Sequence, residues 1–139
     1  MREGFTIFLN FGMELMSDDL SLVKVQFTDI FKRQVRDLAK RYRKIKLDIQ
    51  PVLEQLQSGE LIGDQVQKTG YTVFKVRVKN SDIQKGKSGG YRLIYYVKSS
   101  INILCLLIYS KSEEDNVTSA EITKIIQGFY DTNVMCNYF

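Results

Sequence analysis

Five cations in the second half of the chain have the types and spacing that best fit a chemical role. Residues 74–79 read Phe-Lys-Val-Arg-Val-Lys, so an extended chain would place three cations on one face: Lys75, Arg77 and Lys79. Arg92 lies within the next apolar segment, and Lys111 stands just beyond the last one. Cationic side chains bind phosphate, and arginine can do so through two parallel hydrogen bonds. The pattern predicts a basic face that can hold the phosphate groups of an anionic partner.

The same alternation has a plainer interpretation, the solvated outer face of a half-buried strand. Such faces usually mix both signs of charge, whereas no acid interrupts this trio of cations. Arg92 could likewise pair with an acid across the sheet, although the expected strands contain few acids. We therefore favour a binding role, with Arg92 as the strongest single candidate.

The chain contains no histidine, and this excludes several classes of site. Zinc sites built on histidine, histidine general bases and Ser-His triads cannot form. General acid–base work would fall to lysine, tyrosine or an acid such as Glu113, so positioning and charge stabilisation must carry more of any catalysis. We expect no metal and no small-molecule cofactor.

Composition and charge are typical of one globular domain with an anionic partner. The 139 residues are 44% hydrophobic and 26% charged, with a net charge of +4. Residues 1–22 hold one base against four acids, a balance of −3, so the remainder carries +7. We interpret residues 1–22 as an extension, disordered or outside the native product, and expect no signal peptide or membrane span. Cys105 lies in an apolar run, which predicts a buried thiol in a reducing, cytoplasmic compartment.

Hydrophobic periodicity predicts the elements that must position these cations. Strands are expected at residues 22–27, 74–79, 91–97 and 101–109, and a loop at residues 60–70. Helices are expected from Thr28 or Asp29 to about Tyr42, at residues 45–57, and from a capping box at Thr118 and Glu121 to about Tyr130. Pro51 is unfavourable inside a helix, so the second helix is expected to start after an Asp48 cap or to bend.

This order of elements predicts an α+β fold. It comprises a small antiparallel sheet, made of the first strand and a three-strand meander, with two N-terminal helices packed on one face and a C-terminal helix. The domain is expected to span residues 23–130, followed by a tail at residues 131–139.

Two further groups could contact an anionic ligand. Lys85 and Lys87 lie in a glycine-bearing loop that resembles a phosphate cradle, but its spacing is not that of a Walker A motif and a strand follows it. Tyr109 could stack on a base, although aromatic residues in strands are more often core.

Three stretches of the chain resemble the RelE/ParE superfamily of toxins from type II toxin–antitoxin systems. They are the first strand with its basic helix (residues 25–42), the alternating strand with the Gly-Tyr-Arg-Leu segment after it (74–96), and the end of the apolar strand (106–113). Together the likeness covers about residues 23–130. Within the superfamily the chain is most similar to the RelE and HigB-like mRNA interferases.

The resemblance implies a specific activity. Proteins of this kind bind mRNA in the ribosomal A site and cleave it with the ribose 2′-OH as nucleophile, and a cognate antitoxin blocks them. By position, the catalytic residues would be Lys75, Arg77, Arg92 and Lys111. The RNA-binding residues would be Lys79, Lys85, Lys87 and Tyr109.

The chain departs from the RelE pattern at two positions. Ser112 stands where RelE-like members can carry an arginine, and Thr118 falls near the position of a C-terminal tyrosine. Two alternatives therefore stay open: a ParE-like inhibitor of DNA gyrase without nuclease activity, and a catalytically degenerate RNA-binding homologue.

Overall fold

A computed structural model describes residues 23–83, 89–113 and 116–137 of the chain. The predicted extension at residues 1–22 lies outside this described part, as do Lys85 and Lys87. Among the described residues, no helix combines the length and apolarity needed to cross a membrane.

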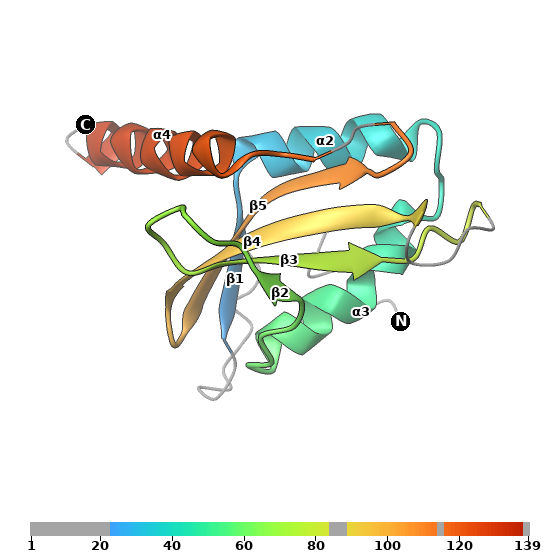
Figure 1. Cartoon of the computed structure of the whole chain (residues 1–139), viewed down its shortest axis with the longest axis horizontal. Helices are drawn as coiled ribbons and strands as arrows, with labels where there is room; N and C mark the ends of the chain where they lie inside the picture. The colour runs from blue at the N-terminus through green and yellow to red at the C-terminus, as the bar shows by residue number, and fades with distance from the viewer. Residues whose placement is uncertain (1–22, 84–88, 114–115, 138–139) are drawn as a thin grey trace.

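The centre of the molecule is one sheet of five strands in the order β1-β5-β4-β3-β2 (Figure 1). The strands are β1 (Lys24–Phe27), β2 (Asp64–Gln65), β3 (Val73–Val78), β4 (Tyr91–Ser99) and β5 (Asn102–Ser110). Strands β2 to β5 are antiparallel neighbours, which confirms the predicted meander. Strand β1 instead runs parallel to β5, because the chain between them is a long crossover and not a hairpin. The α+β class is confirmed, and the expectation of a wholly antiparallel sheet is wrong at β1.

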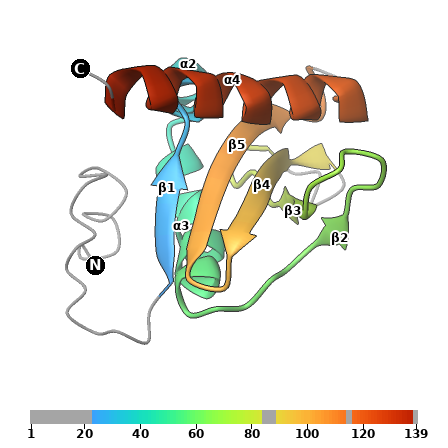
Figure 2. The ribbon, with the colours of Figure 1, turned by 90° about the vertical axis from the view of Figure 1, so that its left-hand side faces the viewer.

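Helices cover both faces of the sheet. Helices α2 (Asp29–Ala39) and α3 (Ile45–Gln57) bury their apolar residues with one face of the sheet, as predicted for the two N-terminal helices. Helix α4 (Ser119–Asn137) buries Ile122 and Ile126 in the apolar cluster of the opposite face. Figure 2 shows this helix crossing the sheet near β5. This helix continues to Asn137, beyond the end expected near Tyr130.

The helix starts follow the sequence signals, with one exception. The Thr28 hydroxyl accepts a hydrogen bond from the backbone N–H of Phe31 and caps α2. Thr118 and Glu121 exchange two hydrogen bonds and form the predicted capping box of α4. Helix α3 begins at Ile45, so Pro51 lies in its interior and the predicted start after Asp48 is wrong. Pro51 leaves the carbonyl of Leu47 without its helical donor, and Leu47 is 64% exposed, so water can reach this turn.

Strand β5 contains an irregularity that decides which way its last residues point. Up to Cys105 its residues alternate simply, but the register with β4 shifts between Ile94 and Tyr95, where Leu106 is the extra residue. Leu106 and Leu107 consequently both belong to the apolar cluster on the α4 face. Tyr109, which simple alternation from Cys105 would turn toward α2 and α3, joins them on that face.

Helix α2 supplies the hydrogen bonds that this irregular part of β5 lacks. Strand β1 pairs only with residues up to Cys105. Beyond it, the Thr28 hydroxyl donates to the Leu106 carbonyl at 2.9 Å, and the Gln34 side chain accepts from the Ile108 N–H at 2.9 Å. Buried backbone groups need such partners, so α2 takes over the role of an edge strand along the second half of β5.

Candidate functional site: a cationic pocket on the sheet

Four of the cations singled out in the sequence line one pocket. Its volume is about 150 Å³, and its lining residues are Asp64, Lys75, Arg77, Arg92, Lys111 and Asn116. This is smaller than the roughly 300–1,000 Å³ of pockets that enclose a whole small molecule. We refer to it as the cationic pocket. Its size and its four cations suit a single phosphate group better than a nucleoside.

The register of the three central strands brings these cations together. Arg77 of β3 stands directly opposite Arg92 of β4, and Arg92 stands directly opposite Tyr109 of β5. Lys75 lies two residues before Arg77, on the same face of β3. The backbone N–H of Lys111 donates to the carbonyl of Gly90 at 2.9 Å, which holds the end of β5 beside the start of β4.

The close approach at this corner depends on Gly90. A Cβ atom added there would lie 2.1 Å from the carbonyl oxygen of Val78, far inside van der Waals contact with a rigid backbone. Glycine thus permits β3 and β4 to meet where Arg77 and Arg92 face each other.

Burial and mutual repulsion shape the electrostatics of the pocket. Burial lowers the pKa of Lys75, and the charges of Arg92 and Lys111 lower it further. Burial also lowers the pKa of Arg92, with Arg77 adding to the effect. Arg92 is only 6% exposed, and one of its guanidinium nitrogens donates to the Tyr91 carbonyl at 3.3 Å. An anion bound here would relieve the repulsion among these charges.

Two pocket residues were not singled out by sequence reasoning. Asp64 lies on β2, directly opposite Lys75, and Asn116 lies in the segment between β5 and α4. Strand β2 has only two residues, too few to show an alternating pattern, and it falls within the expected loop at residues 60–70. Among the six lining residues, Asp64 is the one with an acidic side chain.

The two described members of the predicted RNA-binding set, Lys79 and Tyr109, do not line the pocket. Lys79 is exposed just after β3 and is not a lining residue. Tyr109 is 3% exposed and packs in the apolar cluster on the α4 face. Its ring therefore offers no open face for a base, which corrects the expectation that it stacks on RNA. Lys85 and Lys87 lie outside the described residues.

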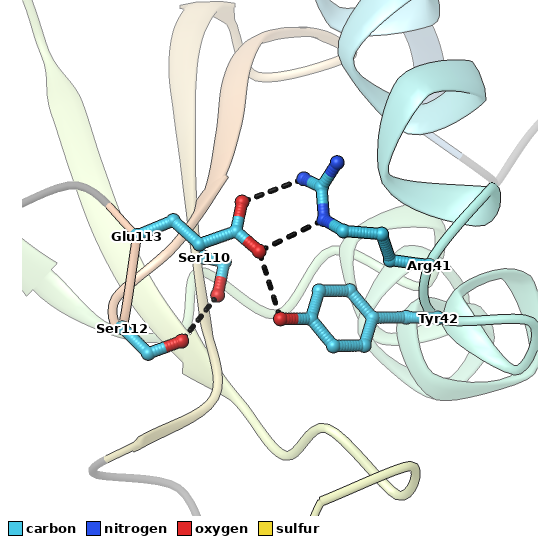
Figure 3. A network of polar contacts seen from close by, with 5 residues as sticks. All are labelled: Arg41, Tyr42, Ser110, Ser112 and Glu113. Carbon is cyan, nitrogen blue, oxygen red and sulfur yellow. Dashed lines mark hydrogen bonds and ion pairs between the residues drawn. The ribbon is translucent and has the colours of Figure 1, made fainter.

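Glu113 binds Arg41 and Tyr42 (Figure 3) and is not among the lining residues of the cationic pocket. Its carboxylate accepts two hydrogen bonds from the Arg41 guanidinium, at 2.9 and 2.6 Å, and one from the Tyr42 hydroxyl at 2.8 Å. The hydrogen bond from Arg41 is the main reason why the pKa of Glu113 is lowered. This carboxylate links β5 to the end of α2 and is a poor candidate for proton transfer in the pocket.

The two positions that depart from the RelE pattern have structural roles of their own. The hydroxyls of Ser112 and Ser110 share a hydrogen bond of 3.1 Å (Figure 3). Thr118 is occupied by the capping box of α4. Neither residue is among those that line the cationic pocket. Within the described part of the chain, no group of three or more acidic or cysteine side chains could hold a metal ion.

The chain matches a known protein family over most of its length. The family described as the RelE toxin of the RelE / RelB toxin–antitoxin system matches residues 28–131, well over half of the chain. The matched region contains strands β2 to β5 and every residue that lines the cationic pocket. A search of curated proteins finds no match. The chain belongs to the RelE toxin family of toxin–antitoxin systems.

Proposed function

We propose that this toxin is a ribosome-dependent mRNA endonuclease that acts in the cytoplasm, inhibits translation and is neutralised by a cognate antitoxin. The observation that carries the proposal is the gathering of Lys75, Arg77, Arg92 and Lys111 around one pocket of phosphate size. Negative charge develops on the oxygens of a phosphodiester as it approaches the transition state of cleavage. Cations that are already in place stabilise this charge, and they do so most strongly where water is excluded.

The buried position of Arg92 supports catalysis over simple adhesion to RNA. Arg92 is only 6% exposed and so has a fixed position on the sheet, as stabilisation of a transition state requires, whereas exposed cations are sufficient for sequence-independent binding of nucleic acid. Arginine keeps its proton, so Arg92 and Arg77 would hold the phosphate and offset its charge. Lys75 and Lys111 can in addition release a proton, which a leaving 5′-oxygen requires.

A reconstituted translation reaction tests this function directly. Purified toxin is added to ribosomes programmed with a defined mRNA, and cleavage is mapped by primer extension. We expect cuts in ribosome-bound mRNA, 2′,3′-cyclic phosphate and 5′-hydroxyl ends, and loss of about 100-fold or more in rate for Arg92→Ala. Arg33→Ala removes an exposed cation of α2 and serves as the matched control.

Three results would contradict the proposal. Intact mRNA together with gyrase-cleaved plasmid would favour the ParE-like alternative. RNA binding without any cleavage would indicate a degenerate homologue. Growth inhibition that survives both Arg92→Ala and Lys75→Ala would remove the cationic pocket from the mechanism.

A further inference from the structure

Among the described residues that line the cationic pocket, Asp64 carries a negative charge. Asp64 is directly opposite Lys75 across the β2–β3 pair, and residues so placed have Cβ atoms about 4.5–5.5 Å apart. A negative charge at this place weakens the attraction of the pocket for phosphate. A site that only held RNA would be better without it.

The backbone on both sides of Asp64 is held in place by close contacts and hydrogen bonds, although β2 has only two residues. Gly63 has φ of +97°, and a Cβ there would lie 2.5 Å from the Lys75 carbonyl oxygen, so only glycine allows β2 this close to β3. On one side of Asp64 the Tyr95 hydroxyl donates to the carbonyl of Ile62. On the other side the N–H of Val66 donates to the carbonyl of Val73 at 2.8 Å. Asp64 is thereby held on the rim of the pocket.

We propose that the Asp64 carboxylate accepts the proton of the ribose 2′-hydroxyl as that hydroxyl attacks the adjacent phosphate, an inference that rests on the nuclease function proposed above. In this step the bond from the 2′-oxygen to phosphorus forms and the bond from phosphorus to the 5′-oxygen breaks. The 2′-hydroxyl proton passes to Asp64, and the ammonium of Lys75 gives a proton to the departing 5′-oxygen. The products are a 2′,3′-cyclic phosphate and a 5′-hydroxyl.

The placement of Asp64 and Lys75 closes the proton cycle. After the products leave, the proton on Asp64 returns to the Lys75 amine across the strand pair, directly or through water, and both groups regain their charges. Burial and the neighbouring cations make Lys75 a stronger acid than an ordinary lysine, which suits it to the donor role. The guanidinium groups of Arg77 and Arg92 keep their protons and cannot share this work.

No other described carboxylate competes for the role in this pocket. Among the residues that the structure describes, Asp64 is the one acidic residue that lines the pocket, and Glu113 is held by Arg41 and Tyr42 near the end of α2. The protein also has no histidine to accept the proton. Asp64 therefore supplies, from β2, the acid–base chemistry that Ser112 and Thr118 cannot.

The decisive variant is Asp64→Asn, which keeps the shape of the side chain but cannot accept the proton. We expect its cleavage of ribosome-bound mRNA to fall by about 100-fold or more. Its affinity for an all-deoxy oligonucleotide, measured by fluorescence anisotropy, should equal or exceed that of the wild type, because the pocket gains net positive charge. Asp64→Glu retains a carboxylate and should recover part of the activity. Glu60→Gln makes the same charge change a few residues away, outside the pocket, and should resemble the wild type.

The outcomes separate the role of Asp64 from the function of the protein. Cleavage by Asp64→Asn within about threefold of the wild type, less than general acid–base catalysis contributes, would overturn the role of Asp64 and leave the nuclease intact. A parallel loss of cleavage and oligonucleotide affinity would also overturn it, because Asp64 would then act by holding Lys75 or the strand. If the wild-type protein itself leaves mRNA whole, the nuclease function fails and the inference fails with it.

Discussion

Arg77 and Arg92 stand directly opposite each other on neighbouring strands of the same sheet. Like charges in such a pair destabilise a sheet by roughly 0.2–1 kcal/mol relative to neutral pairs. Arg92 is buried as well, and its lowered pKa reflects that burial together with the charge of Arg77. An anion that lies between the two guanidinium groups would offset their mutual repulsion.

Replacing Arg77 by glutamine should therefore stabilise the fold and weaken function. We expect the free energy of unfolding to rise by a few tenths to about 1 kcal/mol, because the opposed charges are removed. Urea denaturation measures this change, and anisotropy with single-stranded RNA measures the loss of affinity. Arg33→Gln on α2 is the control and should leave stability nearly unchanged. A lower stability for Arg77→Gln would contradict the idea that this pair is strained.

Binding of RNA should weaken as the pH rises, and it should do so at a pH below the usual pKa of lysine. The pKa of Lys75 is lowered by burial and by the neighbouring cations, so its charge is lost below the usual lysine value of about 10.4. Between the lowered value and the usual one, unfolding takes up a proton, so the contribution of Lys75 to stability rises with pH in that window. Anisotropy titrations at constant ionic strength test the binding. Lys75→Arg should hold its affinity to higher pH, and identical profiles for the two proteins would refute the shift.

Two glycine-to-alanine substitutions should have opposite effects. Gly90→Ala places a Cβ 2.1 Å from the Val78 carbonyl oxygen, so β3 and β4 must separate beside the cationic pocket. We expect a loss of more than about 2 kcal/mol in stability and a loss of cleavage. Gly128→Ala, in α4, meets no atom within 4 Å and should stabilise the helix by about 0.5–1 kcal/mol. Thermal unfolding of both variants provides the comparison. Unchanged stability and cleavage in Gly90→Ala would mean that β3 and β4 can move apart at Val78 at little cost in free energy.

Glu113→Gln should leave cleavage almost unchanged, because this carboxylate binds Arg41 and Tyr42 outside the cationic pocket. The substitution should instead change the pH dependence of the free energy of unfolding at acidic pH. The pKa of Glu113 is lowered by Arg41, so its contribution to stability is present above about pH 4.3 and lost as the pH falls through the lowered value. When the free energy of unfolding is measured at a series of decreasing pH values, the variant should not show this loss of stability. A loss of cleavage comparable to that of Arg92→Ala would move the catalytic centre toward Glu113.

Thr28→Val removes a buried hydroxyl and should clearly lower the free energy of unfolding. That group caps α2 and donates to the carbonyl of Leu106, so its removal leaves both backbone groups without partners. We expect a loss of about 1–3 kcal/mol in the free energy of unfolding, measured with urea. Thr28→Ser keeps the hydroxyl and should stay close to the wild type. Equal stability of the valine variant would show that water replaces the hydroxyl.

The cations of the pocket could be found in the sequence because strand alternation is a local property. Lys75 and Arg77 share a face whatever the rest of the fold does, and Arg92 lies in a segment with clear strand character. Helix α3 and the capping box of α4 could be predicted for the same reason, because hydrophobic periodicity and capping residues are properties of neighbouring positions in the chain.

The remaining features depend on contacts between distant residues. Asp64 joins the pocket through a two-residue strand whose formation requires β3 beside it. The irregularity at Leu106 is invisible in an apolar run, because every position there looks equally suited to burial. The parallel placement of β1 likewise follows from the path of the whole chain and from no pattern within residues 22–27.

The extra residue at Leu106 makes the length of β5 as important as its composition. Deleting Leu106 would remove the irregularity and leave every later side chain of the strand on its present face, because Leu107 would then follow Cys105 in simple alternation. If the strand instead kept all its residues and lost the irregularity, Tyr109 and Lys111 would point toward α2 and α3, and the pocket would lose one wall although no cation had been replaced. A deletion of the Leu106 codon is thus expected to spare the cationic pocket, which a one-residue slip of the strand would disrupt.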